Sequence, residues 1–157
     1  MGFVFFYLVS LALAAELKGT CTRVLDGDTI EVHETAEGEP TRIRLAQIDA
    51  PEKTQEYGVP SKVNLADMVL NREVVVEYDK KDRYGRVIGQ VYVVNGVELV
   101  DANFAQIAAG LAWVYRDYPH TQVYLEEEQD ARKAERGLWK DPFPIPPWHY
   151  RKMKKQK

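Results

Sequence analysis

The stretch RVLDGDTIEV, Arg23–Val32, joins two apolar runs at a corner made of Asp26, Gly27 and Asp28. Asp-Gly between runs of alternating apolar residues is a strong signal for a β-hairpin, because both residue types suit a tight turn. Two aspartates one residue apart raise a second reading, in which the corner is part of a functional site. Taken alone, the stretch favours a turn, and a site requires further charged residues that fold onto the same place.

Five segments have the β-branched or alternating character of strands. They are CTRVL (21–25), TIEVH (29–33), TRIRLAQI (41–48), EVVVEY (73–78) and RVIGQVYVV (86–94). The segment AEGEP closes a hairpin between the second and third strands, and Asn95-Gly96 ends the fifth at a tight turn.

Three further segments have the periodicity of helices. The segment 57–71 lies between the third and fourth strands, and its apolar stripe consists of Val59, Val63, Ala66, Val69 and Leu70. Pro60 suits the first turn of this helix. The segment 99–110 has one apolar face, made of Val100, Phe104, Ile107 and Ala108, and stops at Gly110. The segment 121–136 is rich in charge and ends at Gly137.

This order of elements predicts the fold class, which is mainly β with α. Five short strands with a helix between the third and fourth are typical of an OB-fold, a small and partly open barrel. We therefore expect a five-stranded OB-fold barrel with one inserted helix and two C-terminal helices. OB-folds commonly bind oligonucleotides and oligosaccharides, although a fold by itself does not determine a function.

The length of 157 residues suits one domain, which we expect over residues 16–147. Residues 1–15 are apolar, end in small residues and predict a cleaved signal peptide, although no basic residue precedes the apolar run. A core strand or an uncleaved N-terminal anchor are the alternatives. No stable membrane span is expected, since the run is short for a bilayer. The protein is therefore predicted to be secreted or periplasmic, and to be a monomer.

Cys21 is the only cysteine, so no intramolecular disulfide can form. The three histidines are scattered and give no zinc spacing, which leaves oxygen atoms as the ligands for any metal. The net charge is −3, but residues 148–157 carry five Lys or Arg and no acid, which leaves −8 on the rest. This basic tail is predicted to be a frayed, solvated terminus, with a tether to nucleic acid or another anionic surface as the alternative.

Charged residues recur at the ends of two further strands. In the segment 41–48 the alternation places Ile43 and Leu45 on one face and Arg44 on the other. The sequence DAPE follows, in which Pro51 kinks the chain between Asp49 and Glu52. Each of these features alone is more often an ordinary surface turn.

The sequence DRYGRVIG completes the set, because its polar turn leads Arg86 into the fifth strand. Together with Arg44 and the three carboxylates at 28, 49 and 52, it supplies what phosphodiester cleavage needs. These requirements are oxygen ligands for a metal, a base and two fixed cations.

The motifs DGDT, RIRLAQIDAPE, DRYGRV, GLAWVY and ERGLW, taken in this order, resemble the staphylococcal (micrococcal) nuclease family from about Gly19 to Trp148. The resemblance implies that Asp28, Asp49 and the backbone carbonyl of Ala50 hold Ca²⁺, with Asp26 as a supporting carboxylate. It implies that Glu52 is the general base and that Arg44 and Arg86 hold the phosphate. It also implies that Arg83, Tyr84 and Tyr118 lie near the nucleotide.

The expected function is that of an exported, calcium-dependent endonuclease that acts on DNA and RNA with little sequence specificity. The resemblance implies cleavage of the bond to the 5′ oxygen, which leaves 3′-phosphate ends. The alternatives are a catalytically inactive OB-fold module that binds nucleic acid or protein, and a structural envelope protein. An inactive module is expected to lack one of the charged residues, whereas all of them are present here.

Overall fold

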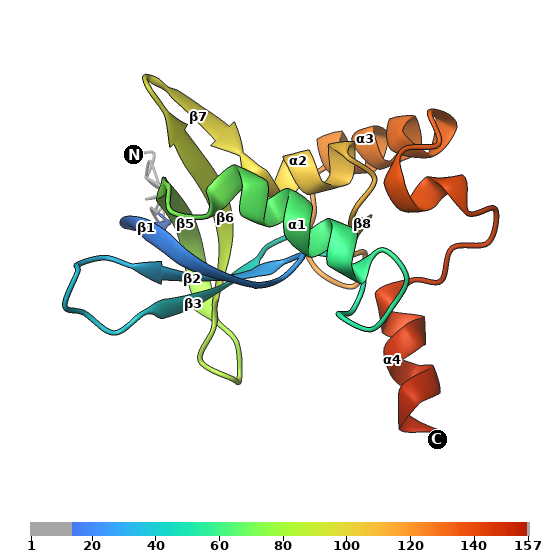
Figure 1. Cartoon of the computed structure of the whole chain (residues 1–157), viewed down its shortest axis with the longest axis horizontal. Helices are drawn as coiled ribbons and strands as arrows, with labels where there is room; N and C mark the ends of the chain where they lie inside the picture. Colours follow the sequence, from blue (N-terminus) through green and yellow to red (C-terminus); the bar gives the residue numbers. More distant parts are fainter. Residues whose placement is uncertain (1–13, 157) are drawn as a thin grey trace, which may run out of the picture.

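The computed structural model describes residues 14–156 (Figure 1). Residues 1–13 of the predicted signal peptide lie outside the described residues. The first strand begins at Ala15, at the end of the predicted leader. Within residues 14–156, no helix is both long and apolar enough to cross a membrane.

Five strands form a closed barrel, as predicted. They are β1 (Ala15–Asp26), β2 (Thr29–His33), β3 (Thr41–Leu45), β5 (Glu73–Lys81) and β6 (Val87–Asn95). Antiparallel pairing joins β3 to β2, β2 to β1, β1 to β5 and β5 to β6. Parallel pairing of β3 with β6, in which Ile43 lies opposite Val87, closes the ring. The fold is therefore mixed α+β with a closed five-stranded barrel, in agreement with an OB-fold.

The barrel interior is filled by alternate residues of each strand, because successive side chains of a strand point to opposite faces. The fully buried members include Ile30, Val32, Ile43, Leu45, Val74, Val76, Val87 and Val91. Burying a large aliphatic side chain stabilises the fold by roughly 1.5–3 kcal/mol. The residues between them, including Arg44, face outward and are available for other contacts.

The strand predicted over 41–48 is interrupted, which the sequence pattern did not indicate. Gln47 has a φ of 68°, a left-handed conformation that ends the extended backbone after β3. The chain resumes as the short strand β4 (Ile48–Asp49), which pairs with β8 (Trp113–Val114) instead of the barrel. This break directs Asp49 away from the line of β3.

The inserted helix is α1 (Gly58–Val69), and its predicted apolar stripe is correct at Val69 and Ala66 but wrong at the other three positions. Val59 and Val63 are 61% and 51% exposed, and the buried side instead contains Gly58, Ser61, Leu65 and Val69. The first turn of α1 lies close to the preceding loop, since a side chain at Gly58 would collide with the carbonyl of Glu52. The small residues Gly58 and Ser61 are therefore buried in this first turn, while Val59 and Val63 face solvent.

The two predicted C-terminal helices are present as α2 (Ala102–Ala108) and α3 (Gln122–Lys133). The predicted start of the first at residue 99 is wrong, because residues Glu98–Asp101 form strand β7 and pair with β6. The Asp101 side chain then accepts a hydrogen bond from the Phe104 N–H and caps α2.

Two helical segments were not predicted. They are a 3₁₀ turn, η1 (Gly137–Lys140), and a C-terminal helix, α4 (Pro147–Lys155). Figure 1 shows α4 in red at the end of the extended segment that follows η1. The prediction of a frayed terminus after residue 148 is therefore wrong. The Trp148 ring packs edge-on against Trp113, with ring centres 5.6 Å apart, and this contact holds the start of the helix.

A buried carboxylate joins α3 to the short strand β8. Glu128 is 1% exposed, accepts a 2.6 Å hydrogen bond from the Val114 N–H and pairs with Arg116 and Arg132. We expect Glu128→Ala to lower the free energy of unfolding by about 2–3 kcal/mol, because a buried N–H is left without its charged acceptor. Urea denaturation with unchanged m-value measures this loss, and Glu126→Ala on the same helix is the control.

Candidate active site

The opening corner of the sequence is a turn in the structure, and its second aspartate is buried. Asp26 pairs with Thr29, so Gly27 and Asp28 form the two-residue connection between β1 and β2. The Asp28 N–H donates a 3.0 Å hydrogen bond to Asp26 Oδ1. Asp28 is 7% exposed. A turn that needed only polarity would leave this carboxylate in water, so its burial points to a further role.

The turn is held rigidly by residues of two helices. Gln106 of α2 is fully buried and donates hydrogen bonds to the Gly27 carbonyl, at 2.7 Å, and to the Ser61 carbonyl, at 3.0 Å. A side chain on Gly27 would collide with the Ser61 hydroxyl of α1. Glycine is therefore required here for close packing. Neither Gln106 nor Ser61 was singled out from the sequence, because nothing in the local pattern distinguishes a buried amide from an exposed one.

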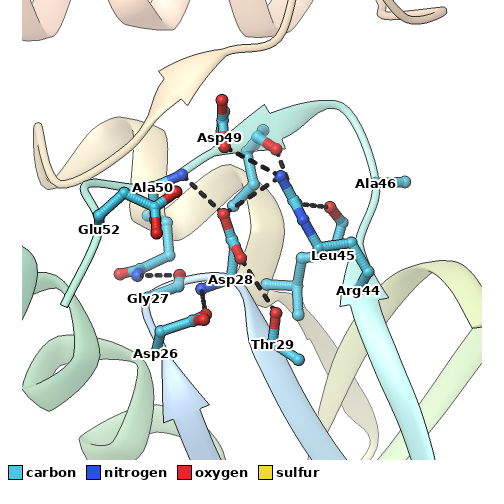
Figure 2. A network of polar contacts seen from close by, with 12 residues as sticks. Asp26, Gly27, Asp28, Thr29, Arg44, Leu45, Ala46, Asp49, Ala50 and Glu52 are labelled. Atoms are coloured by element: carbon cyan, nitrogen blue, oxygen red, sulfur yellow. Dashed lines mark hydrogen bonds and ion pairs between the residues drawn. The ribbon is translucent and has the colours of Figure 1, made fainter. Parts of the chain in front are cut away.

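Asp49 meets Asp28 from the end of a different strand (Figure 2). It lies on β4 opposite Trp113 of β8 and is 2% exposed. The next residue, Ala50, donates its N–H to Asp28 Oδ2 at 2.7 Å, and Thr29 Oγ1 donates to Asp28 Oδ1 at 3.1 Å. The two carboxylates that the resemblance assigned to one metal are thus side by side.

Arg44 connects the two carboxylates. Its Nη2 atom lies 3.2 Å from Asp28 Oδ2 and 3.2 Å from Asp49 Oδ1. Its Nη1 atom donates to the carbonyls of Leu45, at 2.6 Å, and Ile48, at 2.8 Å. These main-chain bonds fix the guanidinium in place and also cap the break between β3 and β4. Arg44 is therefore a fixed positive charge at the carboxylates, with a side chain only 13% exposed.

Glu52 lies at the solvent side of this group, with its side chain 38% exposed. Its Oε1 accepts a 2.7 Å hydrogen bond from Nη1 of Arg151, a residue of α4. Arg151 also pairs with Asp49, at 3.2 Å for Nη1 to Oδ1 and 2.8 Å for Nη2 to Oδ2. The sequence analysis did not identify Arg151. The Pro146-Pro147-Trp148 start could have indicated a helix, since proline is favoured in a first turn, but no local signal indicated its partner.

Arg86 lies on the same face of the sheet as Arg44 but is not in contact with the carboxylates. Arg44 pairs with Ile88, and Arg86 precedes Ile88 by two residues, so the two arginines share a face. Arg86 Nε donates to Asp82 Oδ2 at 2.7 Å, and the Asp82 carboxylate also accepts from the Arg86 N–H. Desolvation raises the pKa of Asp82, but the hydrogen bonds from Arg86 and from the Tyr84 N–H together outweigh it, so the pKa of Asp82 is lowered.

The three residues predicted to contact the nucleotide are exposed. Tyr84 is 69% exposed in the turn before β6, and the guanidinium of Arg83 lies 4.9 Å from the centre of its ring. Tyr118 is 51% exposed and packs against Tyr115, with ring centres 4.7 Å apart. Tyr115 is close enough to Asp49 that the carboxylate, after burial, raises the pKa of its hydroxyl. Tyr118 is thus one residue removed from the acidic group, whereas Arg83 and Tyr84 form a separate exposed turn.

The crowding of carboxylates changes their protonation. Burial, followed by the negative charge of Asp28, raises the pKa of Asp26 to about 7. Burial also raises the pKa of Asp49, and the hydrogen bonds from Arg151 oppose that rise. Anionic groups held this close without enough positive charge have a raised free energy, and a bound cation lowers it.

The donor set fits a hard divalent cation. Among residues 14–156 no three side chains of His, Cys, Asp or Glu converge on a metal position. The oxygen atoms that the sequence assigned to a metal are those of Asp28 and Asp49, whose carboxylates both lie beside Arg44, and the carbonyl of Ala50. Calcium accepts carboxylate and carbonyl oxygens and completes its shell with water, whereas zinc prefers histidine and cysteine.

The chain is similar to nucleases of known families. The family described as staphylococcal nuclease homologue matches residues 42–141. A protein of Escherichia coli described as an uncharacterized endonuclease is 44% identical over 142 residues, which cover 90% of each chain. A micrococcal nuclease of Shigella flexneri is 38% identical over 155 residues, covering 94% of this chain and 88% of that one. An uncharacterized endonuclease of Haemophilus influenzae is 35% identical over 147 residues, covering 92% and 80%.

Proposed function

The chain belongs to the staphylococcal nuclease family, and from that premise we propose that it is an endonuclease that hydrolyses phosphodiester bonds of DNA and RNA. One observation carries the proposal. Two buried aspartates from different strand ends, a fixed arginine between them and a partly exposed glutamate beside them form one acidic group at the barrel surface. Stability alone does not explain this group, because buried charges are costly to keep.

We propose that Asp28, Asp49 and the Ala50 carbonyl hold Ca²⁺. Bound calcium would polarise a phosphoryl oxygen and lower the pKa of a water molecule. The residues contribute by their rigidity, since Asp28 is oriented by Thr29 and the Ala50 N–H before any ligand arrives. A preorganised carboxylate pair binds a cation without further ordering of the chain.

Glu52 is proposed to accept a proton from the attacking water. Its carboxylate lies at the open side of the group, where water and substrate can reach it. The water oxygen bonds to phosphorus, the bond from phosphorus to the 5′ oxygen breaks, and the 5′ oxygen takes a proton from solvent water, which leaves a 3′-phosphate end and a 5′-hydroxyl. Positioned general bases contribute about 10²- to 10⁴-fold to such steps.

Arg44 and Arg86 are proposed to stabilise the negative charge that grows on the phosphoryl oxygens. Both lie on the outer face of the barrel, Arg44 in contact with Asp28 and Asp49 and Arg86 paired with Asp82. We expect Arg86→Lys to lower kcat/KM by an amount equivalent to roughly 2–4 kcal/mol of transition-state stabilisation, because lysine keeps the charge without the fork of donors.

The matched control for Arg86→Lys is Arg42→Lys. Arg42 is on β3, is about half exposed and pairs with Glu31 away from the acidic group. Steady-state cleavage of a fluorescent oligonucleotide measures both variants. Equal activity of Arg86→Lys and the parent would reduce Arg86 to a partner of Asp82.

Cleavage itself is tested by a zymogram with denatured DNA in the gel, incubated first with Ca²⁺ and then with a chelator. The proposal requires a cleared band that the chelator abolishes. No clearing under either condition would favour an inactive binding module.

We further propose export after removal of residues 1–15, and the N-terminal mass of the protein outside the cytoplasm tests this.

A further inference from the structure

We propose that α4 regulates this site, with Arg151 as an internal cation that competes with the divalent metal. The inference rests on the proposed function, because it assumes that Asp49 is a metal ligand. It concerns a residue and a helix that the sequence analysis assigned to a solvated tail.

The contacts of Arg151 are those of a ligand of the acidic group. The guanidinium forms a two-pronged pair with both oxygens of Asp49 and a third bond to Glu52. Both Asp49 oxygens are thereby engaged, and Oδ1 also lies beside Arg44. A cation that coordinates Asp49 must therefore displace Arg151 from at least one oxygen.

The formal charges also argue against calcium and Arg151 binding to Asp49 at the same time. The carboxylates of Asp28, Asp49 and Glu52 lie beside that of Asp26, and Arg44 is a first positive charge among them. Arg151 adds a second positive charge, so less negative charge is available to a cation while Arg151 is in place. A calcium ion and a guanidinium bound to the same carboxylate in a partly buried site are like charges and repel each other strongly. Calcium and Arg151 are thus alternatives for one position.

The Glu52 contact has a consequence for catalysis. The Arg151 guanidinium donates a 2.7 Å hydrogen bond to Oε1 of Glu52, so this oxygen is not free to accept a proton from a water molecule. The bond also occupies the side of Glu52 that faces Asp49. The arrangement with Arg151 bound is therefore a resting state, and cleavage requires its release.

The remaining contacts of α4 make release possible without unfolding the barrel. Pro147 is the only residue of α4 that is buried. Beyond Trp148, the helix is held by exposed hydrogen bonds from Tyr150 and Lys154 to Thr54. A cavity of about 200 Å³ lies between the segment after Glu52 and the chain that leads into α4, lined in part by Gln55, Ile145 and Tyr150. The Arg151 pairs are thus the main tie of the second half of α4.

The test compares Arg151→Gln with Lys152→Gln, which removes an equal charge from an exposed position of the same helix. Calcium affinity of the full chain is measured by calorimetry at constant ionic strength. We expect Arg151→Gln to bind calcium roughly 10- to 100-fold more tightly than the parent, the scale of a lost charged hydrogen-bond pair, and Lys152→Gln to bind as the parent does.

Hydrogen exchange of residues 147–155 provides a second readout. Calcium is expected to speed exchange in the parent, whereas in Arg151→Gln exchange is fast with or without calcium. Equal calcium affinity of parent and Arg151→Gln, with exchange of α4 unchanged by calcium, would overturn the competition and leave the calcium site intact. Absence of calcium binding in both proteins would overturn the metal site as well.

Discussion

Glu52→Gln is expected to lower kcat by about 10²- to 10⁴-fold, because glutamine cannot accept the proton of the attacking water. The structure gives little reason for a loss of stability. Glu52 is partly exposed, and its side chain accepts a hydrogen bond from Arg151 that an amide oxygen can also accept. The loss should therefore appear in turnover and not in folding.

Single-turnover cleavage at saturating calcium measures the effect of Glu52→Gln, and thermal unfolding checks that the variant is folded. Glu56→Gln is the control, since Glu56 is exposed in the same loop four residues later. Parent-like turnover of folded Glu52→Gln would remove this residue from the proposed mechanism. Equal losses in both variants would assign the effect to the loop instead of the base.

Asp28→Asn is expected to abolish most calcium binding and cleavage while the protein folds normally. Asparagine is nearly isosteric, so its oxygen can still accept from the Ala50 N–H and its amide can donate to the Thr29 hydroxyl. The missing charge weakens the pair with Arg44, which Asp49 still holds, and it removes one of two charged ligands from a metal, whose affinity follows the number of charged ligands. Because loss of an outer partner already costs 10- to 100-fold, loss of a direct ligand should exceed about 100-fold.

The measurements for Asp28→Asn are calcium titration by calorimetry, DNA cleavage and unfolding without metal. Asp49→Asn should behave alike, although it lies on another strand. Asp67→Asn, on the exposed side of α1, should change none of the three. If calcium affinity stays at the parent value in Asp28→Asn, the DGD corner serves only as a turn.

Features that neighbouring residues encode were predicted better than features that depend on residues far apart in the chain. The hairpin at Gly27 and the presence and order of the five barrel strands were predicted correctly, although the third strand ends at Leu45 and the first begins at Ala15. Turn chemistry and a period of two are encoded in neighbouring residues. The apolar stripe of α1 was wrong in part, since Ser61 faces the barrel where only a small side chain fits beside Gly27. Periodicity reports which residues are apolar, whereas packing also depends on how closely two backbones approach.

The candidate site shows the same division. Asp28, Asp49, Glu52, Arg44 and Arg86 were identified in the sequence by their motifs and by the family resemblance that those motifs carry. Their spacing alone did not bring them together. The break at Gln47 that turns Asp49 toward Asp28 depends on the pairing of β4 with β8, a strand more than 60 residues away.

By itself, the sequence determined the strands, the turn chemistry and the residue types of an oxygen-ligand site, since each is encoded within a few residues. Only the tertiary structure decided which charges meet. Asp28 bonds to the backbone 22 positions later, and Arg151 reaches Asp49 across 102 positions. Such contacts follow from closure of the barrel and from the course of the chain after it. Local patterns do not encode them, because the free energy that selects them is shared among many packed residues.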